Sequence, residues 1–177
     1  LRDARVGQPY VNRIYLAPVR RSGDQREAAA FQVLAALLGG SSQTSVLERA
    51  LTYDQRVAVS AWAGYGGTAL DNGTFSLGIM PVEGVSLQQA EDALDATLAA
   101  FIESGIDLEQ LERVRMQIRA EAIYQLDDTS ARANSVGADL ALGLTLQDSE
   151  DWLRVLEDVT PDEVLAAARR LDRRESV

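Results

Sequence analysis

The segment LLGGSSQTSVLERALTYDQRVAVSAWAGY, residues 37–65, determines how the rest of the chain is interpreted. Its two leucines end an apolar helical pattern, and at least one of Gly39 and Gly40 should adopt the left-handed conformation that stops a helix. A short helix should follow from Ser45 to about Leu51, because hydroxyl side chains that can cap a helix precede it. Those side chains belong to Ser41, Ser42 and Thr44. The alternation of residues 56–63 then predicts a strand.

The two faces of that predicted strand, Arg56–Ala63, differ in the residues they carry. Because side chains alternate along a strand, one face should carry Val57, Val59 and Ala61, and the other Ala58, Ser60 and Trp62.

Strand and helix patterns continue on both sides of the segment. A strand rich in Val, Ile and Tyr is predicted over Pro9–Val19, with Ile14 and Leu16 on one face, and a helix from about Gln25 to Leu38. Downstream, Gly64–Gly73 contains four glycines and should form a hairpin loop. A strand with one buried face is predicted next, over residues 74–82, and its buried side chains should be Phe75, Leu77 and Ile79.

The remainder of the chain carries helical patterns. Ser86 with Gln89, and Thr160 with Glu163, have the spacing of capping boxes, while Gly105 should end the first of these helices. The predicted helices cover about 87–104, 107–126, 129–142, 144–158 and 161–171. A strand, a helix, two strands and then a helical half form an α+β pattern, so we predict one α+β domain over residues 1–177.

Composition excludes several classes of function. The 177 residues contain 17 Lys+Arg and 27 Asp+Glu, a net charge of −10, which disfavours nucleic acid as a partner. The chain contains neither histidine nor cysteine, so we expect no catalytic residue, no bound metal and no other cofactor in it. No run of about 18 apolar residues exists, so no membrane span is expected.

The central segment resembles the signature of the C-terminal-type domain of pitrilysin/insulinase zinc peptidases, which include mitochondrial processing peptidase. In that family a helix leads to a glycine-rich turn, a short helix and a strand. The residues that match are Gly39, Gly40, Ser41, Ser42, Ser45, Val46, Leu47, Leu51, Ala58 and Ser60. The downstream stretch SLQQAEDALDATLAAFIESGIDLEQLERVRMQIRAEAIY is similar to the family as well.

The resemblance implies a largely antiparallel sheet with helices packed on one face. It also implies a zinc-binding H-x-x-E-H motif on a separate N-terminal domain of a two-domain parent protein, of which this chain would be a fragment. The family's last strand would begin near Val177, where this chain stops. The implied partners are that zinc domain, a paralogous subunit and a peptide substrate. The compartment cannot be deduced, although bacterial relatives with export signals suggest the envelope.

Family members that hold the substrate backbone carry an arginine in the short helix and a tyrosine seven residues later. The corresponding residues here are Thr52 and Val59, while Tyr53 and Arg56 lie nearby but out of register. These four residues are the candidate wall of a substrate chamber. Trp62 could line the same chamber, but we favour a position between helix and sheet.

The missing pair implies a non-catalytic domain from the zinc-bearing subunit of a bacterial two-protein peptidase. The alternative is a degenerate scaffold domain with no peptidase in its assembly, as in respiratory-complex core subunits.

Overall fold

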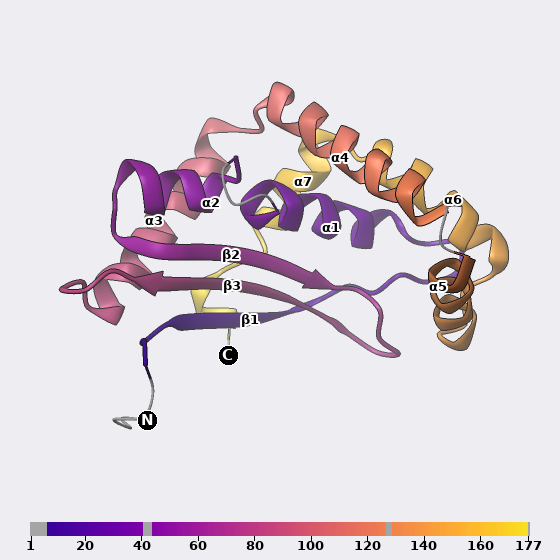
Figure 1. The fold of residues 1–177 in the computed structure, drawn as a ribbon, viewed down its shortest axis with the longest axis horizontal. Coiled ribbons are helices and arrows are strands. Elements are labelled where there is room, and N and C mark those ends of the chain that lie inside the picture. The colour runs from indigo at the N-terminus through magenta and orange to yellow at the C-terminus, as the bar shows by residue number, and fades with distance from the viewer. Residues whose placement is uncertain (1–6, 41–43, 127–128, 177) are drawn as a thin grey trace.

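A computed structural model describes residues 7–40, 44–126 and 129–176. Its elements follow the predicted order along the chain (Figure 1). They are β1 (Val11–Ala17), α1 (Arg26–Gly39), α2 (Val46–Glu48), the π-helical turn η1 (Arg49–Asp54), β2 (Ala58–Gly66), β3 (Gly73–Pro81), α3 (Leu87–Ser104), α4 (Leu108–Leu126), α5 (Thr129–Ala141), α6 (Leu146–Glu157), α7 (Pro161–Ala168) and the 3₁₀ turn η2 (Arg173–Glu175). The α+β class is therefore confirmed.

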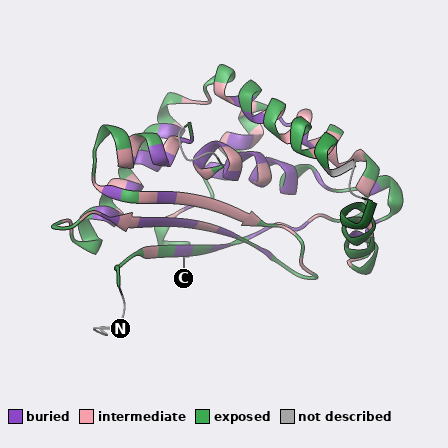
Figure 2. Ribbon diagram, in the orientation of Figure 1, coloured by how far each residue is buried: buried purple, intermediate pink, exposed green. Residues whose placement is uncertain are grey.

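The sheet has three strands in the order β1-β3-β2, and both neighbours pair antiparallel with β3. Helices pack against one of its faces, as predicted (Figures 1 and 2). On that face Phe75, Leu77 and Ile79 of β3 are fully buried, which confirms the alternation read from the sequence. Phe31 of α1 packs on the ring of Phe75, with centroids 5.8 Å apart.

The caps of the later helices are local features and largely match the sequence. Ser86 and Thr160 form the two predicted capping boxes, and Gly105 ends α3 with a φ of 79°. Asp107 accepts hydrogen bonds from the backbone N–H groups of Glu109 and Gln110 at the start of α4. Thr145 forms a further capping box that the sequence analysis did not identify.

The helix ends at the two glycines as predicted, but the expected left-handed conformation is wrong. Gly39 belongs to α1, and Gly40 has ordinary right-handed angles of φ −68° and ψ −44°. Neither is among the described glycines with positive φ. Gly39 is instead required for close packing, because a Cβ atom there would lie 2.1 Å from the backbone nitrogen of Ala63. Gly39 thus marks where α1 touches β2, and the helical angles of the two glycines do not argue against the family resemblance.

The short helix is longer than predicted. It begins at Val46 and continues through η1 to Asp54, three residues beyond the predicted end. Ser45 is its N-cap residue, but the buried Oγ of Ser45 has no hydrogen-bond partner. Thr44 is exposed, and the predicted capping residues Ser41 and Ser42 lie outside the described residues.

The predicted faces of the second strand are correct from Ser60 to Trp62 but wrong before the bulge. β2 begins at Ala58 and contains a bulge between Ala58 and Ser60. Ala58 and Ala61 are therefore both buried, although they are three residues apart, and Val59 is 49% exposed. A bulge adds one residue to one strand and so shifts the alternation that the sequence pattern assumed.

Two predictions about the chain as a whole stay predictions. The expected final strand near Val177 lies at the limit of the described residues, where Arg173–Glu175 form a 3₁₀ turn. The assignment of residues 1–177 as a fragment of a longer protein is not tested by the fold. Within 7–40, 44–126 and 129–176, no helix is both long and apolar enough to cross a membrane.

Candidate functional site

Within the described residues, no helix packs on one face of the sheet (Figure 1). Directly opposite residues in an antiparallel pair point to the same side, so the partners of Thr74, Ser76 and Gly78 share the face opposite to Phe75 and Leu77. We call this surface the open face. Its side chains are Asn12, Ile14 and Leu16 of β1, Ser60 and Trp62 of β2, and Thr74, Ser76 and Met80 of β3. Leu16, at 73% exposed, is the most exposed of its large apolar residues.

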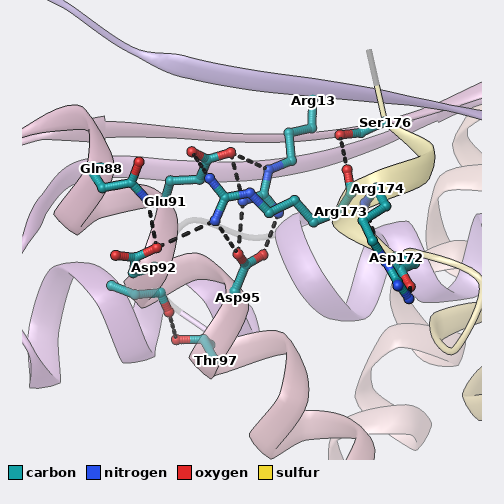
Figure 3. A network of polar contacts seen from close by, with 11 residues as sticks. Arg13, Gln88, Glu91, Asp92, Asp95, Thr97, Asp172, Arg173, Arg174 and Ser176 are labelled. Carbon is teal, nitrogen blue, oxygen red and sulfur yellow. Dashed lines mark hydrogen bonds and ion pairs between the residues drawn. The ribbon is translucent and has the colours of Figure 1, made fainter.

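The open face carries no charged side chain. The three strands contain a single charged residue, Arg13, and its side chain is buried on the helix-covered side. There its guanidinium Nε donates to Glu91 Oε1 at 2.9 Å, and Nη2 donates to Asp95 Oδ2 at 3.0 Å (Figure 3). Arg173 binds the same two carboxylates and attaches the C-terminal turn to α3.

These contacts keep Arg13 charged. Burial lowers the pKa of Arg13, but the hydrogen bonds with Asp95 and Glu91 and the charge of Asp95 outweigh burial and raise the pKa above its ordinary value. The only strand charge is therefore satisfied on the covered side and contributes nothing to the open face.

Trp62 lies on the open face, so the expectation that it packs between helix and sheet is wrong. It pairs with Gly78, and a Cβ atom at position 78 would lie 2.0 Å from the indole ring. Gly78 thus provides the space in which the ring lies flat against β3. The ring of Tyr10 stands beside it, with centroids 6.2 Å apart and planes at 52°. The two aromatic rings form a partly exposed apolar platform.

The backbone is irregular where β2 begins. Arg56, two residues before the strand, has a φ of 56°, and it is the only described residue other than glycine with a positive φ. Its exposed side chain has no hydrogen bond or ion pair within the part of the chain that the structure describes. Val59, in the bulge, is half exposed and offers only apolar contact. A ligand at this end of β2 would therefore meet one free guanidinium and one apolar side chain.

The four predicted wall residues lie on η1, on the turn that follows it and on β2. Thr52 is partly buried, and its Oγ1 has no hydrogen-bond partner. Tyr53 is exposed and lines a hollow of about 700 Å³ between η1 and the start of α4, together with Arg49 and Gln110. Val59 lies in β2 and Arg56 just before it. The sequence placed these residues near one another along the chain, but helix and strand geometry directs them to different surroundings.

Tyr65 does not replace the missing tyrosine. It lies on the covered side of β2, opposite Phe75, and its hydroxyl donates to the carbonyl oxygen of Pro18 at 2.5 Å. Burial raises the pKa of Tyr65 to about 12. Its hydroxyl is therefore occupied within the fold and not available to a ligand.

Sequence reasoning missed the role of Glu48. This buried carboxylate of α2 accepts a hydrogen bond from the backbone N–H of Ala61 at 2.9 Å. The N–H belongs to β2, an edge strand with no further strand beside it in the described sheet. Glu48 thus satisfies one of the edge groups that would otherwise pair with an added strand. The signal available in the sequence was a glutamate among the apolar residues of the short helix.

The chemistry of the donor set does not fit zinc. The chain contains no histidine or cysteine, and the described residues contain no group of three or more acidic side chains placed to hold a metal ion. Zinc sites in proteins are built mainly from nitrogen and sulfur ligands. We therefore derive no catalytic step through a metal on this chain.

Comparison with protein families gives a match over residues 5–118, to the family described as the peptidase M16 inactive domain. This match confirms the resemblance that the signature segment predicted. A comparison with curated proteins finds no match.

Solved structures share the fold at low sequence identity. A protease from Helicobacter pylori has a TM-score of 0.86 at 19% identity, covering 98% of this chain and 41% of that one. The inactive peptidase domain of a zinc protease candidate from Bordetella parapertussis has a TM-score of 0.83 at 20% identity, covering 97% and 90%. A chain of complex III2 from Candida albicans has a TM-score of 0.71 at 13% identity, covering 94% and 40%. The chain thus spans about two fifths of the Helicobacter protein.

Proposed function

We propose that this chain, which belongs to the family of M16 peptidase inactive domains, forms one wall of a chamber that holds an extended peptide. The observation that carries the proposal is the open face, a sheet surface without a covering helix on a domain that lacks zinc ligands. Cleavage would take place on a separate N-terminal domain that holds zinc. The role of this chain is then to bind and orient the peptide and to contact that domain.

We assign the chain to the zinc-bearing member of a two-protein peptidase. Thr52 and Val59 stand where other family members carry arginine and tyrosine. Neither can replace the pair, because the Thr52 side chain is short and partly buried and Val59 has no polar group. A hydrogen bond to a charged donor is worth roughly 1.5–3 kcal/mol, which is about tenfold or more in rate. A paralogous subunit that carries the pair would supply these contacts.

Reconstitution tests this division of labour. The full-length protein alone should be nearly inactive toward peptides, and addition of the paralogous subunit should restore cleavage. The matched control is a paralogue in which its own arginine and tyrosine are both replaced by alanine, which should restore little. Full activity of the isolated full-length protein, unchanged by the paralogue, would contradict the assignment.

The second candidate is a scaffold domain in an assembly without peptidase activity. The loss of both substrate-holding residues favours it, because a degenerate member has no need to keep them. An intact H-x-x-E-H motif in the segment that precedes this domain in the full-length gene would support the peptidase. Loss of that motif would support the scaffold.

A further inference from the structure

We infer that the open face selects an uncharged peptide segment with apolar and aromatic side chains. The inference rests on the proposed function, because it names the class of substrate that the proposed chamber wall would take. It follows from three features of the sheet: the distribution of charge, the aromatic platform, and the hydrogen bond that already occupies a backbone N–H on the β2 edge.

The open face lacks charged side chains, although the chain as a whole is rich in them. The chain carries 17 basic and 27 acidic residues, yet the strands contain only Arg13, which points to the covered side and is neutralised by Glu91 and Asp95. Among the described residues, the other charged side chains near the sheet lie beyond the strand ends, for example Arg56 before β2 and Glu83 after β3. A charged peptide side chain laid on the centre of the face would lose water without gaining a counter-ion, which is unfavourable.

The aromatic platform offers an anchoring position. Trp62 is seated over Gly78, and the contact limits its freedom before any ligand arrives. Rigid, partly exposed aromatic side chains bind at a low cost in conformational entropy, and they frequently dominate the energy of an interface. Ile14 and Leu16 extend the apolar surface along β1. An aliphatic or aromatic peptide side chain therefore gains contact at several points on the face.

The β2 edge favours recognition by side chains over pairing of backbones. At Ala61 the N–H group that an added strand would use already donates to Glu48. A peptide at this position therefore lies across the open face, where the chemistry of its side chains determines affinity. At the β2 edge, specificity then depends on apolar contact and desolvation and not on a ladder of backbone hydrogen bonds.

Peptide titrations followed by NMR of the ¹⁵N-labelled chain test the inference. Three extended peptides of equal length would be used: one with Leu, Phe and Thr, one with the apolar residues replaced by Glu, and one with them replaced by Arg. Salt of about 0.15 M limits long-range attraction of the basic peptide to the net charge of −10. We expect the uncharged peptide to bind at least about tenfold more tightly than either charged one, with shifts in the amides of β1, β2 and β3.

A pair of matched variants locates the binding surface. Leu16 is 73% exposed on the open face, and Leu70 is 75% exposed in the loop between β2 and β3. Leu16→Asp should weaken binding of the uncharged peptide about tenfold, whereas Leu70→Asp should leave it unchanged. Trp62→Ala should weaken it by a similar factor, because it removes the platform.

The possible outcomes separate the inference from the proposed function. Equal or tighter binding of a charged peptide at the same amides overturns the inference and leaves the chamber wall intact. Absence of shifts on the open face with every peptide overturns the proposed function as well. Light scattering tests the remaining outcome. If the chain forms a stable dimer and Leu16→Asp abolishes it, the open face binds a second copy, and the inference is overturned.

Discussion

The two faces of the same three-stranded sheet have opposite chemistry. Along β3, Phe75 and Leu77 point to the helices and are fully buried, while Thr74 and Ser76, which alternate with them, point to the open face. The covered face also holds the only strand charge, Arg13, paired with carboxylates of α3. Stability is thus concentrated on one side of the sheet, and the other side can carry recognition residues at little cost to the fold.

The largest expected difference between the faces concerns two leucines. Leu77→Ala removes a fully buried side chain and leaves a cavity in the core, which should lower the free energy of unfolding by about 2–5 kcal/mol. Leu16→Ala removes an exposed side chain and should change it by no more than about 0.5 kcal/mol. Urea denaturation of both variants measures the difference. A similar loss of unfolding free energy in both variants would mean that the open face is covered in the folded protein.

A smaller difference in the free energy of unfolding is expected between alanine variants of two glycines, each of which lies close to β2. Gly39→Ala would place a methyl group against the backbone of Ala63, which cannot move away, and should cost about 2–3 kcal/mol despite the better helix propensity of alanine. Gly78→Ala meets only the ring of Trp62, which can swing into water, and should cost about 1 kcal/mol.

Fluorescence distinguishes the two mechanisms. In a Trp152→Phe background the remaining indole is Trp62, and Gly78→Ala should shift its emission to longer wavelength as the ring becomes hydrated. Gly39→Ala should leave the emission of the folded state unchanged. An unchanged emission in Gly78→Ala would show that the ring does not rest on β3.

The smallest expected effect is a pH dependence of stability, which comes from an ion pair between two helices. A hydrogen bond from Arg26 lowers the pKa of Glu163 to about 2; burial opposes the shift, and Thr160 adds to it. A lowered folded pKa means that the contribution is complete above the ordinary pKa near 4.5 and is lost as pH falls toward 2. The pair is partly exposed, so its contribution should not exceed about 1 kcal/mol.

Glu163→Gln should therefore destabilise the protein at pH 7 and approach the wild-type stability as pH falls from about 4.5 to 2. The control is Glu109→Gln, which removes a highly exposed carboxylate whose ion pair with Arg113 measures 3.8 Å. Thermal unfolding across the pH range measures both. Binding of uncharged peptides to the open face should not follow this pH dependence, because its strand residues include no carboxylate.

Much of the fold could be predicted because it depends on local patterns. The alternation of Phe75, Leu77 and Ile79 and the capping boxes at Ser86 and Thr160 involve residues within a few positions of each other. The element order and the matches around Gly39 and Gly40 were sufficient to identify the family. The absence of histidine and cysteine likewise excluded a zinc site of the usual kind from composition alone.

The candidate site was predicted less well, because it depends on contacts between distant parts of the chain. The bulge at Val59 breaks the expected alternation of β2, so that Ala58 and Ala61 point to the same side, and residues 56–63 contain no signal that predicts it. Gly39 is needed because α1 touches Ala63, Gly78 leaves room for the ring of Trp62, and the buried Glu48 accepts from the N–H of Ala61. The sequence by itself determined which elements form and what chemistry they lack. Only the tertiary structure decided which side chains reach the open face, because register and close packing are set when separate elements meet.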